Sequence, residues 1–383
     1  MGILRTNKIS GLGTDGTVFQ GVTRFDTQGY FVAPSGTTDQ RNAGITTTDG
    51  TIRFNTDSQK LEFYAQSQWW EMVIDTPNLG VGADTGAGAR GVFGGGNNEA
   101  GTRTAAIVYV NIASTGNAVS FGNLTVTRNT LRSCSSSTRG LWAGGFTPTA
   151  SNTIDYVTIS STGDAIDFGD LSSSLTPASG TALSNATRGI FAGGNVPARN
   201  NVIEYVTIAT TGNSIDFGDL SAIKSNLGAL ASPVRGVFAG GYIAPASINV
   251  IEYIAIATLG NTQDFGDLTK TTTNLSGCSN AIRGVFAGQQ NGNSNVIEYI
   301  TISTLGNAVK FGELTLAREL LSNMACSSST RGVFMGGDTP SPTLSQNVID
   351  YVTIMTQGNA VDFGDLIART AAGSCCSNAH GGL

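Results

Sequence analysis

Residues that could carry out acid–base, nucleophilic or metal chemistry are few in this chain of 383 residues. His380 is the only histidine, and the five cysteines are Cys134, Cys278, Cys326, Cys375 and Cys376. A Ser–His–Asp or Cys–His arrangement would have to use His380, and a metal site would have one histidine ligand at most. The sequence therefore predicts no catalytic residue, no metal site, no cofactor and no enzymatic activity.

Two short motifs match functional signatures by their letters alone. Gly11-Leu12-Gly13-Thr14-Asp15-Gly16 has the spacing of a dinucleotide-binding loop, but no strand precedes it and no βαβ unit surrounds it. Asp167-Phe168-Gly169 has the letters of a kinase motif, but this trio belongs to a repeated sequence. We interpret the first motif as a loop and the second as part of the repeat.

The chain repeats one pattern six times, roughly R-G-[VLI]-[FW]-A-G-G, a short gap, then [IV]-[DE]-Y-[VI]-T-I-x-T-x-G-N-x-x-D-F-G-D-L. The copies begin at Arg90, Arg139, Arg188, Arg235, Arg283 and Arg331. A period of 47 to 49 residues indicates an array of identical supersecondary units. Alternating apolar residues, such as those of Val202 to Thr210, and turns such as Thr211-Gly212-Asn213 predict four short antiparallel strands in each unit.

The unit resembles the kelch repeat, which has a double glycine ending one strand, a tyrosine in the next and an aromatic residue in the last. The matching glycines are Gly95-Gly96, Gly144-Gly145, Gly193-Gly194, Gly240-Gly241 and Gly336-Gly337, whereas one unit has Gly288-Gln289. The tyrosines are Tyr109, Tyr156, Tyr205, Tyr253, Tyr299 and Tyr351, and the aromatics are Phe121, Phe168, Phe217, Phe265, Phe311 and Phe363. The resemblance implies an all-β fold, with a six-bladed β-propeller over residues 90–383.

The first unit lacks a good first strand, because the sequence before Arg90 is rich in glycine. Ser374 to His380 matches the missing strand, so we expect the C-terminal strand to complete blade one and to protect its edge. Cys134, Leu183, Leu230, Cys278, Cys326 and Cys375 each lie five residues before the next start, counting His380 as a truncated start. We expect this position to be a small apolar core position, with Cys376 as an extra cysteine and no disulfides.

Length variation within the unit predicts where a partner would bind. The spacing from the tyrosine to the phenylalanine is 12 residues in every unit, but the spacing from the opening arginine to the tyrosine varies from 16 to 20 residues. The connections between strands two and three, and between strand four and the next unit, therefore vary, and both lie on one face of an antiparallel blade. Such loops on a rigid scaffold often carry binding residues. The candidates are Asn97, Asn98, Phe146, Asn195, Tyr242, Gln290, Asn291 and Asp338, and the alternative is relaxed constraint on exposed loops.

Charged residues also recur in the unit. We interpret the opening arginines and the acids Asp170, Asp219, Asp267, Glu313 and Asp365 as structural pairs or backbone caps; a ring of arginines that binds an anion is the alternative. The first unit lacks the acids, with Val108 before its tyrosine and Asn123 at the later position.

Residues 1–75 do not repeat and are predicted to form a β-rich adaptor domain, followed by a Gly-rich linker at 76–89. Gly50 to Tyr64 indicates a hairpin that turns near Asp57-Ser58, and Trp69-Trp70 begins a third strand. This segment resembles a motif of bacteriophage tail-fibre and other virion proteins, and the repeat is similar to one in virion proteins of cyanobacterial phages. Trp69 and Trp70 are core residues or candidate contacts with a virion partner.

The resemblance implies a virion structural protein, assembled in the host cytoplasm, whose residues 1–75 contact other virion proteins. The displayed propeller would serve host-surface adsorption by binding a glycan or protein partner. The protein would form a homo-oligomer on the particle, and a trimer is favoured. A capsid-decoration or collar protein without a receptor is the alternative, and a glycan-acting enzyme is a third hypothesis. The net charge is −6 and the sequence has no basic patch, so we expect no nucleic-acid partner. We also expect no membrane insertion, because the sequence contains no stretch of 18 consecutive apolar residues.

Overall fold

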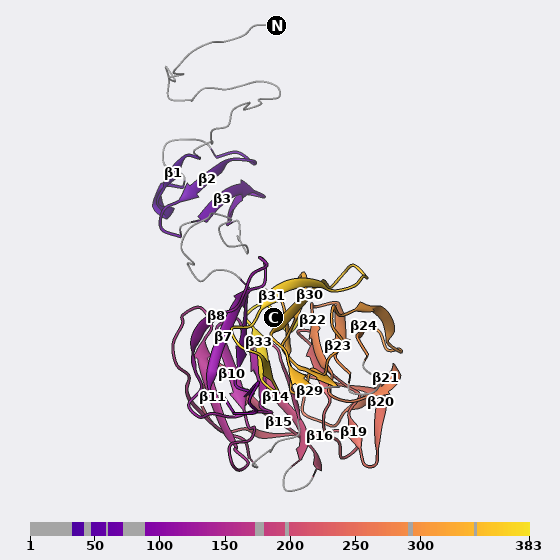
Figure 1. Cartoon of the computed structure of the whole chain (residues 1–383). Coiled ribbons are helices and arrows are strands. Elements are labelled where there is room, and N and C mark those ends of the chain that lie inside the picture. The colour runs from indigo at the N-terminus through magenta and orange to yellow at the C-terminus, as the bar shows by residue number, and fades with distance from the viewer. Residues whose placement is uncertain are drawn as a thin grey trace, which may run out of the picture. The chain divides into compact units, whose positions relative to one another are not determined.

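The computed structural model describes residues 33–41, 47–58, 60–71, 89–172, 180–195, 199–289, 294–340 and 343–383. The chain divides into two compact units, Met1–Gly80 and Val81–Leu383, which we call the N-terminal unit and the repeat region (Figure 1). The described residues form β-strands and one short 3-10 helix, η1 (Thr38–Gln40). The prediction of an all-β fold is therefore confirmed. Residues 76–88 of the predicted linker lie outside the described residues.

The N-terminal unit is one four-stranded sheet. Its strands, in sheet order, are β1 (Ser35–Gly36), β2 (Ile52–Asn55), β3 (Lys60–Ala65) and β4 (Gln68–Glu71). The predicted hairpin is confirmed, because β2 and β3 pair antiparallel around a turn at residues 56–58. The third predicted strand is also present as β4, which pairs with β3.

The described part of the repeat region contains six antiparallel sheets that share a four-stranded core, and the fourth also includes the short strand β19 (Tyr242–Ile243). The first sheet holds β33 (Ser374–Ser377), β5 (Arg90–Gly94), β7 (Ala106–Asn111) and β8 (Val119–Asn123). The second holds β9 (Arg132–Ser135), β10 (Arg139–Ala143), β11 (Thr153–Thr158) and β12 (Ile166–Asp170), and the third β13 (Thr181–Ser184), β14 (Arg188–Asn195), β15 (Arg199–Thr207) and β16 (Ile215–Asp219).

The remaining sheets follow the same order. The fourth holds β17 (Gly228–Ala231), β18 (Arg235–Ala239), β20 (Ala246–Ala255) and β21 (Gln263–Thr272). The fifth holds β22 (Ser276–Ser279), β23 (Arg283–Ala287), β24 (Val296–Thr301) and β25 (Val309–Glu313), and the sixth β26 (Ala325–Ser327), β27 (Arg331–Met335), β30 (Val348–Thr353) and β31 (Val361–Asp365). Short strands in the connections are β6 (Asn97–Asn98), β19 (Tyr242–Ile243), β28 (Asp338–Pro340), β29 (Thr343–Ser345) and β32 (Thr370–Ala371).

The constant 12-residue spacing has a structural cause in the hairpin of the third and fourth strands. In all six sheets the tyrosine meets the phenylalanine edge to face, with ring centroids 5.9 to 6.1 Å apart. This pair buries the phenylalanine and orients the tyrosine for a second contact described below. A change in hairpin length would break the pairing, so the spacing does not vary.

The double glycine ends the second strand because both residues adopt positive φ. The first glycine of each of the five pairs has φ between 61° and 68°, and the second between 99° and 132°. Side chains other than glycine adopt this backbone rarely. A Cβ at Gly145, for example, would lie 2.7 Å from the carbonyl oxygen of Asn129. The double glycine thus allows the chain to pass close to the connection that enters the same sheet.

The first strands of the six sheets, which we call the inner strands, contact one another in the cyclic order β9, β13, β17, β22, β26, β33 and back to β9. A cysteine or leucine of each inner strand packs on the glycine that follows the opening arginine of the next sheet. Cys134 covers Gly189, and Cys326 of the sixth sheet covers Gly91 of the first. As expected from the missing first strand, β33 pairs antiparallel with β5.

The register of β33 corrects one prediction. Cys376, not Cys375, occupies the repeated core position, because it pairs with Val92 as Cys134 pairs with Leu141. Cys376 also covers Gly140 of the second sheet, which completes the cyclic packing. His380 therefore stands one residue before the position of an opening arginine. Treating His380 as equivalent to the opening arginines shifted the alignment of this last segment by one residue, because the truncated repeat offers few residues to align.

Candidate functional sites: the loop face and the central cavity

The connections between strands two and three, and those that enter the next sheet, lie together as predicted. Backbone bridges join the two kinds of connection at Asn129 and Phe146, at Ser225 and Tyr242, and at Glu319 and Asp338, and β6 pairs with β32 in the same way. We call the surface formed by these connections the loop face. It holds most of the candidate binding residues, and it lies at the opposite end of the sheets from the opening arginines.

The two aromatic candidates on the loop face are partly covered by arginines from the preceding sheet. The guanidinium of Arg103 lies 4.6 Å from the ring centre of Phe146, and that of Arg199 lies 4.6 Å from the ring centre of Tyr242. Arg199 also donates a hydrogen bond to the hydroxyl of Ser225 at 3.2 Å. Each cation–π pair joins two neighbouring sheets, so one function of these aromatics is to tie the loops together.

The two neighbouring asparagines of β6 have different surroundings. Asn97 accepts a hydrogen bond from the side chain of Asn129 at 2.9 Å, which links the first and second sheets. The side-chain oxygen of Asn98 accepts from the backbone N–H groups of Ala100 and Thr102, at 3.0 and 2.9 Å. Both side chains thus stabilise turns of the loop face.

A chain of polar side chains on the loop face is absent from the sequence-based candidates. Asn226 donates to Asn274 at 2.6 Å, and Asn274 donates to Glu319 at 2.9 Å. Burial raises the pKa of Glu319 above its usual value, and the nearby charge of Asp338 acts in the same direction. Burial also raises the pKa of Asp338, whose carboxylate accepts from Ser345 at 2.9 Å. Asn226 and Asn274 both have positive φ, at 62° and 60°, and no local sequence signal indicates that they meet.

The other loop candidates are less informative. Asn195 ends β14 and pairs with Arg199, but its side chain is not described. Gln290 and Asn291 lie outside the described residues. The structure thus brings Asn97, Asn98, Phe146, Tyr242 and Asp338 onto one face without gathering them into a single pocket.

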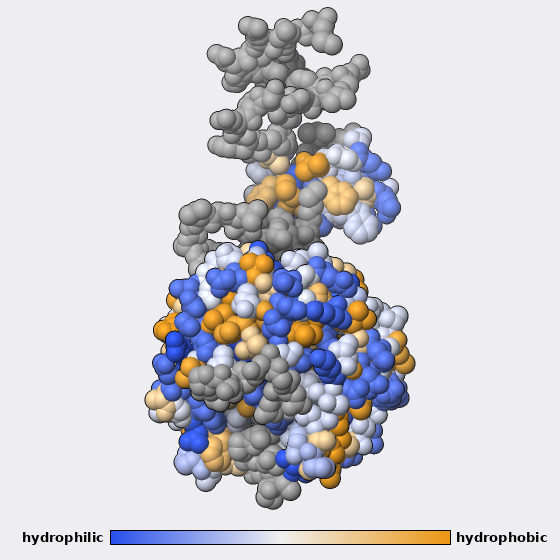
Figure 2. Space-filling model, turned by 45° about the vertical axis from the view of Figure 1, so that its right-hand side comes forward, coloured by the Kyte–Doolittle hydropathy of each residue, from blue (hydrophilic) through white to orange (hydrophobic). Residues whose placement is uncertain are grey.

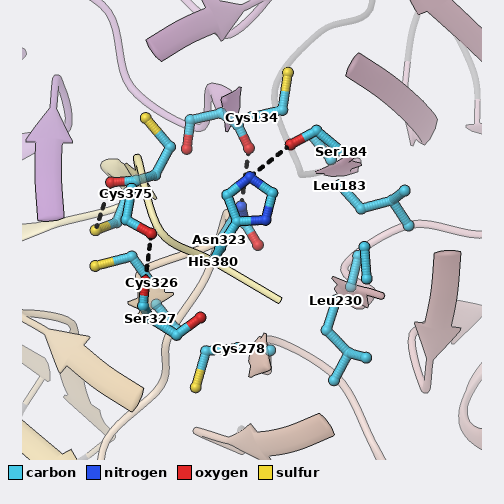
Figure 3. Close-up of a pocket in the computed structure, with 18 of the residues that line it drawn as sticks. Cys134, Leu183, Ser184, Leu230, Cys278, Asn323, Cys326, Ser327, Cys375 and His380 are labelled. Carbon is cyan, nitrogen blue, oxygen red and sulfur yellow. Dashed lines mark hydrogen bonds between the residues drawn. The ribbon is translucent and has the colours of Figure 1, made fainter. Parts of the chain in front are cut away.

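A small cavity of about 50 Å³ lies among the inner strands (Figure 3). Residues of all six inner strands line it, together with Asn323 and His380, and the volume suffices for a few water molecules. His380 points into the cavity, where Nε2 donates to the carbonyl oxygen of Ser135 at 2.9 Å and Nδ1 accepts from Gly382 N–H at 3.1 Å. Burial lowers the pKa of His380 to about 4, so the imidazole is neutral at pH 7.

Five serines form a directional chain of hydrogen bonds around this cavity. Each hydroxyl donates to the carbonyl of the same position in the preceding sheet at 2.5 to 2.7 Å, and the donors are Ser135, Ser184, Ser279, Ser327 and Ser377. Ala231 takes the sixth position and leaves the chain open between the third and fourth sheets. These hydrogen bonds join successive inner strands.

Four of the five cysteines around the cavity are poor nucleophiles. All five are free and buried, and burial raises the pKa of the thiols of Cys134, Cys278, Cys375 and Cys376 well above the ordinary value. Thiols that stay protonated neither attack substrates nor bind metals readily. Among the residues that the structure describes, no three His, Cys, Asp or Glu side chains are grouped for metal binding.

The opening arginines make structural contacts with the backbone. Each guanidinium stacks on the tyrosine of its own sheet, 4.4 to 4.8 Å from the ring centre. Each also donates to a carbonyl of the next sheet at 2.7 to 3.1 Å, and Arg331 of the sixth sheet reaches Ile112 of the first. The backbone-capping interpretation is thus confirmed. A pairing with the later acids is wrong: Asp170, for example, ends β12 at the other end of the sheet.

The acids before the tyrosines are buried and contribute to the seams between sheets. Asp155 receives a hydrogen bond from Arg128 at 2.6 Å, Glu252 contacts Lys224 at 2.6 Å, and Asp350 contacts Arg318 at 2.6 Å. Each partner comes from the connection that enters the sheet of the acid. These pairs are fully desolvated, so loss of one partner would leave an unpaired buried charge.

The candidate docking residues of the N-terminal unit differ in exposure. Trp69 packs edge to face on Tyr64 with ring centres 5.4 Å apart, and Arg53 lies 5.8 Å from its ring. Trp70 is 42% exposed, and its indole N–H donates to the carbonyl of Ala65 at 3.0 Å. Trp70 is thus the more accessible of the two candidates for contact with a partner.

The comparisons with known proteins assign this chain to no family. No model of a known protein family matches it, and no curated protein gives a significant match. In the described part of the chain, no helix has the length and apolarity to cross a membrane.

Proposed function

We propose that the repeat region is a six-bladed, kelch-like β-propeller displayed on a phage virion for host-surface adsorption. In this proposal, residues 1–75 attach the protein to other virion proteins, and the protein forms a trimer on the particle. The cyclic contacts of the inner strands and the pairing of β33 with β5 support the propeller. The role does not involve catalysis.

The single observation that carries the adsorption proposal is the gathering of variable connections on the loop face. The backbone bridges place these connections together on sheets that are otherwise nearly identical. A rigid scaffold with variable loops is a common design for recognition. The side chains there include amides, hydroxyls and aromatic rings as well as charged groups such as Arg103, Arg199 and Asp338, which together suit a glycan or a protein surface. Hydrophilic and hydrophobic residues are interspersed on the face of the repeat region seen in Figure 2.

One observation favours the second function, a capsid-decoration or collar protein without a receptor. Phe146 and Tyr242 already stack on Arg103 and Arg199, which gives both aromatics a structural use. A decoration protein requires stable loops but no ligand.

Binding of the labelled full-length protein to envelope material of the host bacterium separates the two functions. Under the adsorption proposal the protein binds, and the substitution Tyr242→Ala or Asp338→Ala weakens binding at least about tenfold, as for a central interface residue. The matched control is Ile215→Thr, at an exposed position on β16 away from the loop face. No binding to the envelope material would overturn adsorption and leave the architectural role. Sedimentation of the full-length protein tests the trimer, which a monomer would contradict.

A further inference from the structure

A cleft of about 420 Å³ opens between the first sheet and the connection that follows β31 of the sixth sheet. We call it the closing-seam cleft, because it lies where the end of the repeat array meets its beginning. Apolar and neutral polar residues line it. The lining includes Phe93, Ile107, Val108, Leu366, Ile367 and Ala368, with Asn98, Thr104, Ser120, Asn123 and Thr370.

The other five seams are filled at this place by a buried acid. In each, the acid before the tyrosine accepts a hydrogen bond from the Ser or Thr that follows the last leucine of the preceding unit. Asp155 bonds to the hydroxyl of Thr125 at 2.6 Å, and Glu298 to the backbone N–H of Thr269 at 2.9 Å. The same pairing holds for Glu204 with Ser172, for Glu252 with Ser221 and for Asp350 with Thr315. A carboxylate, its partners and their hydrogen bonds thus close these seams.

The closing seam has lost both members of this pair. Val108 stands at the position of the acid, and Ile367 at the position of the Ser or Thr. Valine has no carboxylate to accept a hydrogen bond across the seam, and Ile367 is 62% exposed, so its side chain does not fill the space between the two sheets. The result is a cleft instead of a packed seam, with an isoleucine at its mouth.

The chemistry of the lining indicates which ligand would fit. No charged side chain lines the cleft, so a charged ligand would lose its hydration without gaining a counter-ion. The volume falls in the range of about 300 to 1,000 Å³ that is usual for small-molecule sites. Thr104 and Asn98, at the loop-face end, supply neutral polar groups. Asn98 is also one of the candidates identified from the sequence.

We propose that the closing-seam cleft binds a small, uncharged ligand with an apolar ring-sized body and one neutral hydrogen-bonding group. The apolar body lies on Val108, Ile367 and Ala368, and the polar group faces Asn98 and Thr104. The valine and isoleucine that form this site stand at one seam of the six. The proposal does not depend on a virion role or on adsorption.

Fluorine NMR of the full-length protein with 5-fluoroindole tests the proposal. The resonance of the probe should broaden and shift on titration, and methyl signals of Val108 and Ile367 should move at the same concentrations. The charged analogue 5-fluoroindole-3-acetate should bind at least tenfold more weakly. A probe that leaves those methyl signals unchanged, or an analogue that binds equally well, would overturn the proposal.

A double substitution, Val108→Glu with Ile367→Thr, rebuilds the pair that closes the other five seams. It should weaken binding of 5-fluoroindole at least tenfold while thermal unfolding remains cooperative. The matched control is Ile215→Thr, which also replaces an exposed isoleucine on the repeat region and should leave binding unchanged. Unchanged binding by a folded double variant would contradict the site. Should the double variant fail to fold, the methyl shifts of the wild-type protein still decide the outcome.

Discussion

At the scale of the residue, each opening arginine connects two neighbouring sheets. Its guanidinium stacks on the tyrosine of its own sheet and donates hydrogen bonds to the backbone of the next sheet. Arg235, for example, stacks on Tyr253 and reaches the carbonyls of Ile302 and Ser303 at 2.9 and 3.0 Å. A planar guanidinium can make both contacts at once, whereas an ammonium group cannot. The recurrence of arginine in all six units therefore has a structural explanation.

We predict that Arg235→Ala lowers the free energy of unfolding by about 1 to 2 kcal/mol, because two charge-assisted hydrogen bonds and a cation–π contact are lost. Arg235→Lys should recover only part of this loss. Urea denaturation of the purified protein measures both effects. The control is Arg369→Ala, which breaks an exposed ion pair with Glu99 and should cost less than about 0.5 kcal/mol. Equal effects of the two alanine substitutions would refute the proposed bridge.

His380 makes stability depend on pH. Its pKa in the folded protein is about 4, below the ordinary value of 6.5, because burial disfavours the imidazolium form. Between these values the unfolded chain binds more protons than the folded one. The stability contributed by neutral His380 is therefore complete above about pH 6.5 and is lost as the pH falls toward 4.

We predict that His380→Asn makes the unfolding free energy less dependent on pH between about 6.5 and 4. The difference in slope from the wild type should not exceed about 1.4 kcal/mol per pH unit, the limit for one proton. Chemical denaturation at several pH values measures both slopes. Parallel curves for the two proteins would show that His380 is not buried as a neutral group.

At the scale of the element, the inner strands are joined by the serine chain as well as by apolar packing. Small residues occupy these strands because six of them approach one another around the central cavity. The chain of hydroxyls has one gap, at Ala231, where the carbonyl of Ser184 receives no serine hydroxyl from the fourth sheet. Gly382 instead lies beside this carbonyl, since a Cβ on it would be 1.9 Å from the oxygen.

We predict that Ser279→Ala lowers the free energy of unfolding by about 1 kcal/mol or more, because it removes a buried hydrogen bond to Ala231 at 2.6 Å. Ala231→Ser should raise it by up to about 1 kcal/mol, by adding the missing donor to the chain. Thermal and urea denaturation measure the two changes. A destabilising effect of Ala231→Ser would mean that the gap accommodates Gly382 and that the chain is not incomplete.

At the scale of the whole molecule, the first sheet joins the beginning and the end of the repeat region. The inner strand of this sheet comes from residues 374–377, and its other three strands come from residues 90–123. The sixth and first sheets are also linked by backbone hydrogen bonds, such as that from Gly116 N–H to the carbonyl of Phe363 at 2.8 Å. Closure of the first sheet thus depends on the four residues of β33.

We predict that a chain ending at Gly373 is destabilised by more than about 3 kcal/mol, because it loses a buried strand and exposes the edge of β5. A chain ending at His380 retains β33 and should lose much less. Calorimetry compares the unfolding temperatures of the three proteins. A synthetic peptide of residues 374–383 should restore much of the loss by adding the missing strand. Undiminished stability without β33 would show that closure is not required.

Much of this architecture could be predicted from the repeat. The Tyr–Phe spacing, the double glycine and the alternating apolar residues are local signals, so strands and hairpins followed directly from them. The role of Cys376 did not, because the alignment of the truncated start rested on His380 alone. The asparagines of the polar chain at Asn226 and Asn274 were missed, since an amide in a loop gives no sign that it will meet another one 48 residues away.

The sequence by itself determined the number of units, the strands within each and the face on which length varies, because these depend on residues close together in the chain. Only the tertiary structure decided what the recurring charges do. The arginines reach the backbone of the next sheet, and the buried acids close the seams between sheets. It also decided that Val108 and Ile367, 259 positions apart in the chain, line one cleft. Such contacts join residues from opposite ends of the repeat array, and no local pattern specifies them.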